Sequence, residues 1–221
     1  MAKSNKQWWL LTDQDSLWYL VGLIATDGCL STDGRHIDIT SKHKDFLDKI
    51  CNKFNLRTKP SRKNNGRNQY SYRIQISSKE FYNFLLSINL TPKKSKTLNK
   101  LQIPDRSFHS FVRGVIDGDG SIRRWTHSQN GKEQWMLKIS SGSEKFLEWL
   151  ANKVENLYGL SGALHPKYSG GAFVLKYGKL AAQILLRHCY KKNKLTLNRK
   201  YLVAKECFNT KKGWQKSKTV H

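Results

Sequence analysis

Two aspartates, Asp27 and Asp119, occupy the same place in a repeated stretch of sequence. Residues 20–28 read LVGLIATDG and residues 112–120 read VRGVIDGDG. Each stretch has apolar residues at helical spacing and closes with Asp-Gly. A single Asp-Gly is ordinary turn chemistry. Two of them, 92 residues apart and closing equivalent helices, indicate a duplicated functional carboxylate.

Small residues in both stretches predict that the two helices pack on each other. Gly22 and Thr26 lie four residues apart, and so do Gly114 and Gly118. Residues with this spacing share one helix face, so both helices carry a face without bulky side chains. Such faces allow two helix backbones to approach closely.

The acids close each helix at the end where a carboxylate is least stable. We expect Gly28 and Gly120 to take the left-handed conformation that ends a helix, which leaves Asp27 and Asp119 in the last turn. The negative end of the helix dipole disfavours a carboxylate there by roughly 0.3–1 kcal/mol. Two acids brought together also repel each other. A divalent cation would remove both penalties.

The charge balance indicates a polyanionic partner. The 221 residues include 40 Lys and Arg against 16 Asp and Glu, for a net charge of +24. Such a surface binds nucleic acid strongly and in a salt-sensitive way, because bound phosphates release their counterions. A membrane surface and the ribosome are the alternative partners. The length allows either one large domain or two of about 100 residues.

The sequence also argues against several classes of protein. No run of about 18 apolar residues exists, and the N-terminus lacks the apolar core of a signal peptide. We therefore expect no membrane partner and a location inside a cell, in the cytoplasm or nucleoid, or in an organelle matrix if the gene is organellar. The cysteines form no C-x-x-C pair, so neither a zinc site nor a disulfide framework is indicated.

Hydrophobic periodicity predicts alternating helices and antiparallel hairpins in each half. Residues 70–77 give the clearest strand, with Arg73 and Gln75 on the face opposite the isoleucines. Long polar side chains on one sheet face are suited to reading base edges in a DNA groove. The preceding residues, 58–69, are basic and turn-rich, and are predicted to form a loop.

The repeat continues beyond the two motifs. Ile39, Ser41 and Phe46 recur as Ile139, Ser141 and Phe146, now 100 residues apart, which places an eight-residue insertion in the second hairpin. The duplication predicts two halves, residues 1–100 and 101–221, and the second ends in a basic tail.

Two halves of this kind resemble the LAGLIDADG homing endonucleases of the single-chain, duplicated type. The resemblance implies an α+β fold of two αββαββ half-domains related by pseudo-two-fold symmetry. The motif helices would form the interface, and the antiparallel sheets would form a saddle in the major groove of DNA. One position departs from the family motif: its first acid is Asp117 in the second copy but Ala25 in the first.

The resemblance also implies a metal site. Asp27 and Asp119 would bind Mg²⁺, for which Mn²⁺ could substitute, and the carbonyls of Thr26 and Gly118 would complete the inner shell. The candidates for basic catalytic residues around the metal are Lys42, Lys94 and Lys200, with Lys194 as a competing choice for Lys200. The candidate DNA contacts are Arg35, Arg73, Gln75, Arg123, Arg124, Lys138 and Lys176.

The activity implied is Mg²⁺-dependent hydrolysis of both strands of a long, asymmetric double-stranded DNA target, leaving a short staggered cut. A pseudo-symmetric chain would act as a monomer. One alternative is an RNA-binding maturase on the same fold, whose partner would be the host group I intron RNA. Another is a DNA-binding relic without catalysis, which the loss of either acid would favour. Both acids are present.

Overall fold

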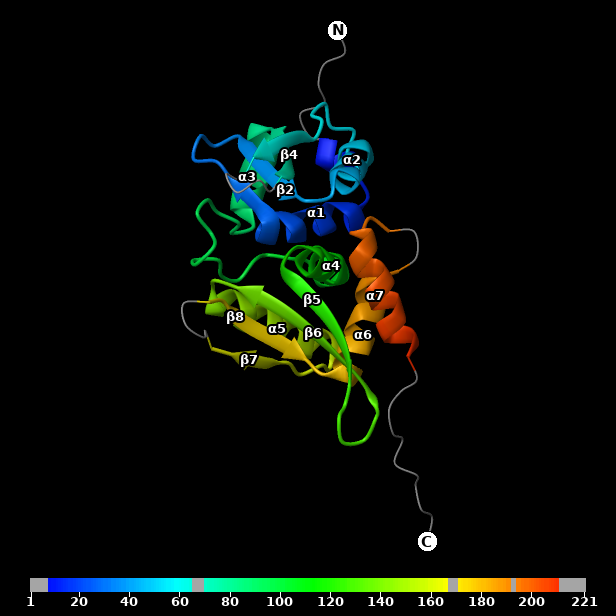
Figure 1. Cartoon of the computed structure of the whole chain (residues 1–221). Coiled ribbons are helices and arrows are strands. Elements are labelled where there is room, and N and C mark those ends of the chain that lie inside the picture. Colours follow the sequence, from blue (N-terminus) through cyan, green and yellow to red (C-terminus); the bar gives the residue numbers. More distant parts are fainter. Residues whose placement is uncertain (1–7, 65–69, 167–170, 192–193, 211–221) are drawn as a thin grey trace.

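The structure, a computed structural model, describes residues 8–64, 70–166, 171–191 and 194–210. Two four-stranded antiparallel sheets, each formed by one half of the chain, flank a central pair of helices (Figure 1). This arrangement confirms the expected α+β fold. The end of the predicted loop, residues 65–69, and the basic tail, residues 211–221, lie outside the described residues.

The first half begins with a short 3-10 helix, η1, and continues with α1 directly followed by the first sheet. The strand order is β1-β2-β4-β3. The elements are η1 (Trp8–Leu11), α1 (Gln14–Asp27), β1 (Gly28–Leu30), β2 (His36–Ser41), α2 (Lys44–Lys53), β3 (Ser61–Asn64), β4 (Tyr70–Ser77) and α3 (Lys79–Ser87).

The second half repeats this plan and adds a final helix. Its strand order, β5-β6-β8-β7, is equivalent to that of the first sheet. The elements are η2 (Asp105–Ser107), α4 (Phe108–Asp119), β5 (Gly120–Thr126), β6 (Glu133–Ser141), α5 (Glu144–Tyr158), β7 (Ala163–His165), β8 (Phe173–Tyr177), α6 (Lys179–Cys189) and α7 (Asn198–Asn209).

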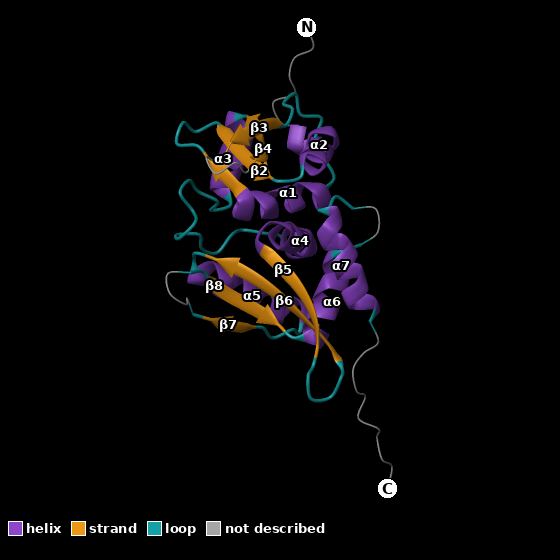
Figure 2. Ribbon diagram, viewed as in Figure 1, coloured by secondary structure: helices purple, strands orange, loops and turns teal. Residues whose placement is uncertain are grey.

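Helices cover one face of each sheet and bury its apolar residues. In the first sheet Ile37, Ile39 and Ile74 are fully buried under α2 and α3. In the second sheet Leu137 and Leu175 are fully buried under α5 and α6. Figure 2 shows this helical layer behind the strands of the second sheet. The alternate residues of each strand form the opposite face, which carries the polar side chains.

One strand was not expected from the sequence. Residues 61–64 belong to β3, which pairs with β4 at the edge of the first sheet, whereas we expected a loop. All four residues are exposed, so they carry no apolar alternation that would reveal a strand. The second hairpin, β5–β6, is longer than β1–β2 and projects from the body of the protein (Figure 1).

The glycines after the motif helices do not act as expected. Gly28 has φ −89° and ψ 159°, and Gly120 has φ −82° and ψ 152°, so both are extended rather than left-handed. The reason for glycine is close packing. A Cβ on Gly28 would lie 2.6 Å from the Cα of Ile24, and one on Gly120 would lie 2.7 Å from the Cα of Ile116. Each motif helix therefore passes directly into the first strand of its sheet.

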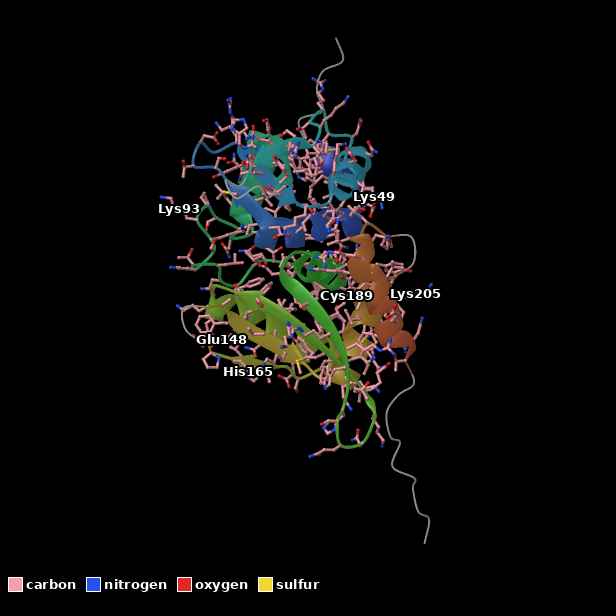
Figure 3. All side chains as sticks on the ribbon, viewed as in Figure 1. Lys49, Lys93, Glu148, His165, Cys189 and Lys205 are labelled. Atoms are coloured by element: carbon pink, nitrogen blue, oxygen red, sulfur yellow. The ribbon has the colours of Figure 1, made fainter. Side chains whose placement is uncertain are left out.

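The cysteines are all free, and Cys51, Cys189 and Cys207 are buried whereas Cys29 is exposed. Cys189 lies inside the second half, while Lys205 lies on the exposed side of α7 (Figure 3). Along the described parts of the chain, no helix is long and apolar enough to cross a bilayer.

Candidate active site

The two motif helices touch through their backbones. A Cβ on Gly22 would lie well under 3.0 Å from the carbonyl oxygen of Phe111, and a Cβ on Gly114 would lie equally close to that of Tyr19. Real Cβ atoms essentially never come so near, so only glycine fits at either position. Because Phe111 and Tyr19 are themselves equivalent in the repeat, the contact has pseudo-two-fold symmetry.

The helices run in the same direction, which brings their acids to one end. One turn beyond Gly114, Gly118 packs against Thr26, and a Cβ on Gly118 would lie 3.5 Å from the carboxyl carbon of Asp27. Asp27 and Asp119 each occupy the last position of their helix. The two carboxylates therefore meet where the helix pair opens toward the two sheets.

Both acids are destabilised as carboxylates. Desolvation by the surrounding protein and the negative charge of Asp119 raise the pKa of Asp27 to about 6. Desolvation likewise raises the pKa of Asp119. Both side chains still reach the surface, so a ligand could approach them from solvent. A cation between them would relieve both the desolvation and the repulsion.

The oxygen atoms at this end suit a hard divalent cation. Among the described residues no group of three or more His, Cys, Asp or Glu side chains could hold a metal. Backbone carbonyls could supply further ligands, for which Thr26 and Gly118 are the candidates, although the Gly118 carbonyl already accepts the Lys200 ammonium at 2.8 Å. Mg²⁺ fits this set, because it takes one or two carboxylates and keeps water and phosphate oxygens as its other ligands.

Two buried lysines end at the same helix termini. Lys94 donates to the carbonyl oxygen of Gly28. Desolvation lowers the pKa of Lys94, and desolvation lowers that of Lys200 to about 8. The Lys200 ammonium donates to the last carbonyl oxygens of α4, which belong to Ile116 at 2.7 Å, Asp117 at 2.7 Å and Gly118 at 2.8 Å.

The structure separates Lys194 from the carboxylates. Lys194 lies 3.8 Å from Asp15, near the start of α1, whereas Asp27 is the last residue of that helix. Twelve residues of helix span about 18 Å, so Lys200 rather than Lys194 faces the acids. Lys42 is exposed directly after β2.

Arg199 and His43 approach the same region and were not identified from the sequence. The Arg199 Nε donates to the Nε2 of His43 at 3.2 Å, which joins α7 to the start of α2 across the two halves. The positive charge of Arg199 also acts on Asp27. Arg199 belongs to the basic run Tyr190–Lys200, so composition indicated this segment without indicating which residue mattered.

Asp117, the acid present in only one copy, is not at the surface. Asp117 is 2% exposed, and its carboxylate accepts hydrogen bonds from the hydroxyls of Tyr19 (2.7 Å) and Tyr190 (2.6 Å) and from the backbone N–H of Leu197 (2.7 Å). A buried carboxylate that already accepts three hydrogen bonds from the protein has a structural role and does not act as a metal ligand.

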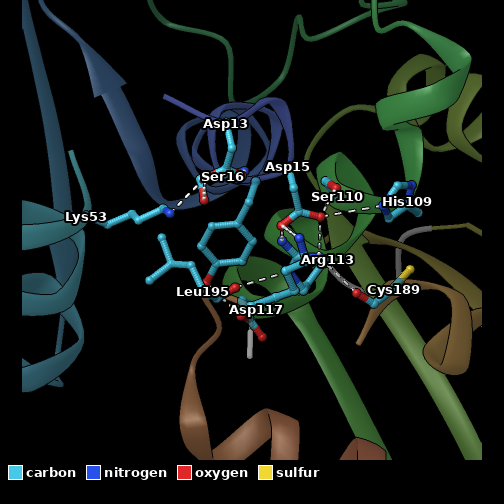
Figure 4. Close-up of polar contacts among 12 residues, drawn as sticks. Asp13, Asp15, Ser16, Lys53, His109, Ser110, Arg113, Asp117, Cys189 and Leu195 are labelled. Atoms are coloured by element: carbon cyan, nitrogen blue, oxygen red, sulfur yellow. Dashed lines mark hydrogen bonds and ion pairs between the residues drawn. The ribbon is translucent and has the colours of Figure 1, made fainter. Parts of the chain in front are cut away.

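A buried ion pair crosses the interface one turn away. Arg113 is fully buried and its guanidinium lies 2.6 Å from the carboxylate of Asp15 (Figure 4). It also donates to the carbonyl oxygens of Cys189 at 3.0 Å and Leu195 at 3.1 Å. Ser110 donates to Asp15 at 2.7 Å. The pair is therefore well supplied with partners, which a buried ion pair requires.

The open face of the first sheet carries a connected polar group. Gln75 donates to Asp38 at 3.0 Å, and Arg73 lies 3.6 Å from the same carboxylate. Asp38 and Gln75 are directly opposite each other on β2 and β4. Arg35, in contrast, is exposed in the turn before β2 rather than on the sheet.

The open face of the second sheet is more strongly cationic. Lys138 and Lys176 are directly opposite each other on β6 and β8. Desolvation and the charges of Arg123 and Lys176 lower the pKa of Lys138. Three cations thus gather without an acid among them, and like charges placed opposite each other are destabilising. An anion bound to this face would relieve that repulsion.

Arg124 lies on the other side of the same strand. Its guanidinium is 2.6 Å from Glu133 and 5.7 Å from the ring of Trp135. Trp135 is buried on the helix-covered face of the sheet, and successive residues of a strand point to opposite faces. The structure therefore groups Arg123, but not Arg124, with Lys138 and Lys176.

Comparisons with known proteins agree with this architecture. A family model described as a LAGLIDADG-like domain matches residues 15–89. The solved homing endonuclease I-WcaI, bound to its DNA recognition sequence, shares 14% identity and a TM-score of 0.62 over 92% of this chain and 94% of that one. Mesophilic variants of the homing endonuclease I-DmoI share 17% identity and a TM-score of 0.56 over 87% and 98%.

A third similar structure is full-length DUF199/WhiA from Thermatoga maritima, with 15% identity and a TM-score of 0.55. The match covers 87% of this chain but only 60% of that protein, so the chain spans less than two thirds of its length. No curated protein matches the sequence. The chain therefore has the fold of the single-chain homing endonucleases I-WcaI and I-DmoI, and its residues 15–89 resemble the LAGLIDADG-like domain family.

Proposed function

We propose that this protein is a site-specific DNA endonuclease that cuts both strands of a long, asymmetric duplex. Asp27 and Asp119 would hold Mg²⁺, with Mn²⁺ as a substitute, and the backbone carbonyls of Thr26 and Gly118 would complete the inner shell. A single chain supplies both halves of the site, so the active form would be a monomer.

The convergence of the two carboxylates is the observation that carries this proposal. Each acid is the last residue of its motif helix, and the next residue begins the first strand of a sheet. The acids therefore lie between two sheets whose open faces bear Arg73 and Gln75 on one side and Arg123, Lys138 and Lys176 on the other. A duplex lying across both sheets would bring its phosphates to the acids.

The sheet faces support a duplex as the substrate. A two-stranded or larger β-surface fits the major groove, where base edges present a distinct donor and acceptor pattern. The longer β5–β6 hairpin extends the surface in the second half only. Two halves of unequal reach and charge would read an asymmetric sequence, so no palindrome is required.

The chemistry divides between metal and protein. Bound Mg²⁺ would polarise the scissile phosphate, stabilise the leaving oxygen and lower the pKa of an attacking water. Lys94 and Lys200 would place positive charge where the pentavalent phosphate develops negative charge, in a site already partly desolvated. Arg199 would bind a phosphate next to the scissile one. Lys42 would contact the DNA backbone.

Selection from a random pool tests the function. The protein would be incubated with randomised duplexes and Mg²⁺, and the newly formed ends would be sequenced. We expect one asymmetric site with a short stagger, and no ends in EDTA. A protein that forms no ends in Mg²⁺ or Mn²⁺ from a saturating pool would contradict the proposal, and tight binding to a structured intron RNA would then favour the maturase alternative.

A further inference from the structure

The second motif helix carries two charged residues that the first lacks. Arg113 and Asp117 lie one turn apart on α4 and are both buried. At the separation of 92 that relates the motifs, their equivalents on α1 are Val21 and Ala25, which are also buried. The two motif helices are therefore equivalent in position, but α4 has two charged residues where α1 has two apolar ones.

These two residues hold both ends of the segment that connects α6 to α7. At the end of α6, Arg113 binds the carbonyl of Cys189 and Asp117 binds the hydroxyl of Tyr190. At the start of α7, Arg113 binds the carbonyl of Leu195 and Asp117 binds the N–H of Leu197. The connection is thus fixed to α4 at four points.

At the junction between α4 and α7, each helix places a charged side chain at the end of the other. Asp117 places its carboxylate at the N-terminus of α7, where the helix dipole favours a negative charge. Lys200, in the first turn of α7, places its ammonium on the C-terminal carbonyls of α4, where a positive charge is favoured. Lys200 is three positions after Leu197, so the residue that Asp117 binds and the lysine lie about one helical turn apart.

Within residues 8–64 and 70–100, the described part of the first half, no equivalent anchor is present. Lys94 lies in the turn that follows α3, and its ammonium donates to the carbonyl of Gly28. Ala25 offers no acceptor at the position of Asp117. Both lysines face the paired acids, but only Lys200 is carried by a helix whose start is anchored to a motif helix.

We propose that Asp117 is a positioning residue, which fixes the start of α7 so that the Lys200 ammonium stays against the end of α4 beside Asp119. Loss of this anchor frees Lys200 while leaving Lys94 in place. The effect of this loss on DNA cleavage rests on the proposed function. The pseudo-two-fold axis that exchanges the halves also exchanges the strands of a bound duplex, so loss of Asp117 selectively slows one of the two cuts.

Three variants separate positioning from general stability. Asp117→Asn removes one acceptor oxygen and leaves a bound donor unpaired. Tyr190→Phe removes a single hydroxyl that binds the same carboxylate from the α6 end of the connection. Tyr19→Phe is the matched control, since it removes an equivalent hydroxyl bond to Asp117 from α1 and leaves both anchors of the connection intact.

The rate of lysine acetylation measures how well Lys200 is protected, and it needs neither DNA nor metal. The protein would be treated with an acetylating reagent and the rate at each lysine followed by mass spectrometry. Lys94, buried like Lys200, is the slow reference, and exposed Lys205 on α7 is the fast one. In Asp117→Asn we expect acetylation of Lys200 to accelerate by about tenfold or more relative to Lys94, since unpairing a buried group shifts a local equilibrium by that order.

The controls decide the outcome. Tyr190→Phe should accelerate Lys200 to a smaller extent, and Tyr19→Phe should leave it as slow as in the wild type. Unchanged protection of Lys200 in both Asp117→Asn and Tyr190→Phe would overturn the proposal. Equal acceleration in Tyr19→Phe would also overturn it, because general loosening would then explain the effect.

Cleavage of a plasmid that carries the selected target gives a second readout. Asp117→Asn should accumulate nicked circles, because one strand is cut at close to the wild-type rate and the other is delayed. Equal slowing of both cuts would contradict the strand-specific role. If wild-type protein cuts no DNA at all, the proposed function fails, while the acetylation result still decides whether Asp117 positions Lys200.

Discussion

Gly22 of α1 and Gly114 of α4 make the same contact from opposite sides of the helix interface. Each lies against a backbone carbonyl of the other helix, Phe111 for Gly22 and Tyr19 for Gly114. This reciprocal contact sets the separation of the motif helices, and their separation sets that of the two carboxylates at their ends.

Alanine at either glycine should therefore destabilise the whole protein. The neighbour of each new Cβ is backbone, which cannot move aside, so Gly22→Ala and Gly114→Ala should each lower the free energy of unfolding by about 1–3 kcal/mol or more. Urea denaturation measures the effect. Gly178→Ala is the control, because a Cβ there meets nothing within 4 Å, and wild-type stability in all three variants would contradict the packing described.

The Asp15–Arg113 pair should stabilise the interface in a pH-dependent way. Burial alone would raise the pKa of Asp15, but hydrogen bonds from His109, Arg113 and Ser110 hold it well below its usual range. A folded pKa below the unfolded value of about 3.9 adds stability above that pH, and this stability is lost as the pH falls further.

Thermal unfolding between pH 6 and 2.5 tests the pair. The wild type should lose stability below about pH 4 more steeply than Asp15→Asn, which has no such carboxylate to protonate. Arg113→Met leaves Asp15 without its main partner and should cost about 3–5 kcal/mol at neutral pH. Parallel pH profiles for the wild type and Asp15→Asn would contradict this role.

Asp38 should restrain non-specific binding. It lies between Arg73 and Gln75 and neutralises part of the first sheet face. Asp38→Asn keeps the shape and removes the charge, so affinity for random duplex should rise and the slope of log affinity against log salt should steepen by up to about 0.9. Asp48→Asn on the helix-covered side makes the same charge change and should alter neither quantity.

DNA binding should depend strongly on salt through the second sheet. If at least six phosphates are neutralised, affinity should fall roughly 10³-fold or more between 50 and 200 mM salt. Lys138→Met and Lys176→Met should each reduce the slope by up to about 0.9, whereas Lys145→Met on α5 should not. Fluorescence anisotropy with a labelled duplex measures all three, and a flat salt dependence of the wild type would rule out a sheet-borne duplex site.

The sequence revealed the parts of the fold that depend on periodicity and repetition. The four-residue spacing of Gly22 and Thr26, and of Gly114 and Gly118, predicted a close helix pair. The alternation in residues 70–77 predicted a strand with Arg73 and Gln75 on its open face. Strand β3 was not predicted, because an edge strand exposed on both faces has no alternation of apolar and polar residues. Arg124 was grouped with Arg123 because a basic pair shows its charge but not which member faces the open side.

The parts that escaped depend on contacts between distant segments. The sequence shows that Ala25 and Asp117 differ, but only folding brings Tyr190 and Leu197 to the Asp117 carboxylate. We expected Gly28 and Gly120 because glycine can take a left-handed backbone conformation. The structure shows instead that a Cβ at either position would collide with the preceding helical turn. Choosing Lys200 over Lys194 likewise needed the direction of the final helix.

The most direct test of the paired-acid site is cleavage of the selected target by Asp27→Asn and Asp119→Asn in Mg²⁺. These carboxylates hold the metal in our proposal, so each variant should lose double-strand cleavage while keeping DNA affinity close to that of the wild type and losing no thermal stability. Either variant that still cuts both strands at the wild-type rate would contradict the assignment of these two acids as the metal-binding pair.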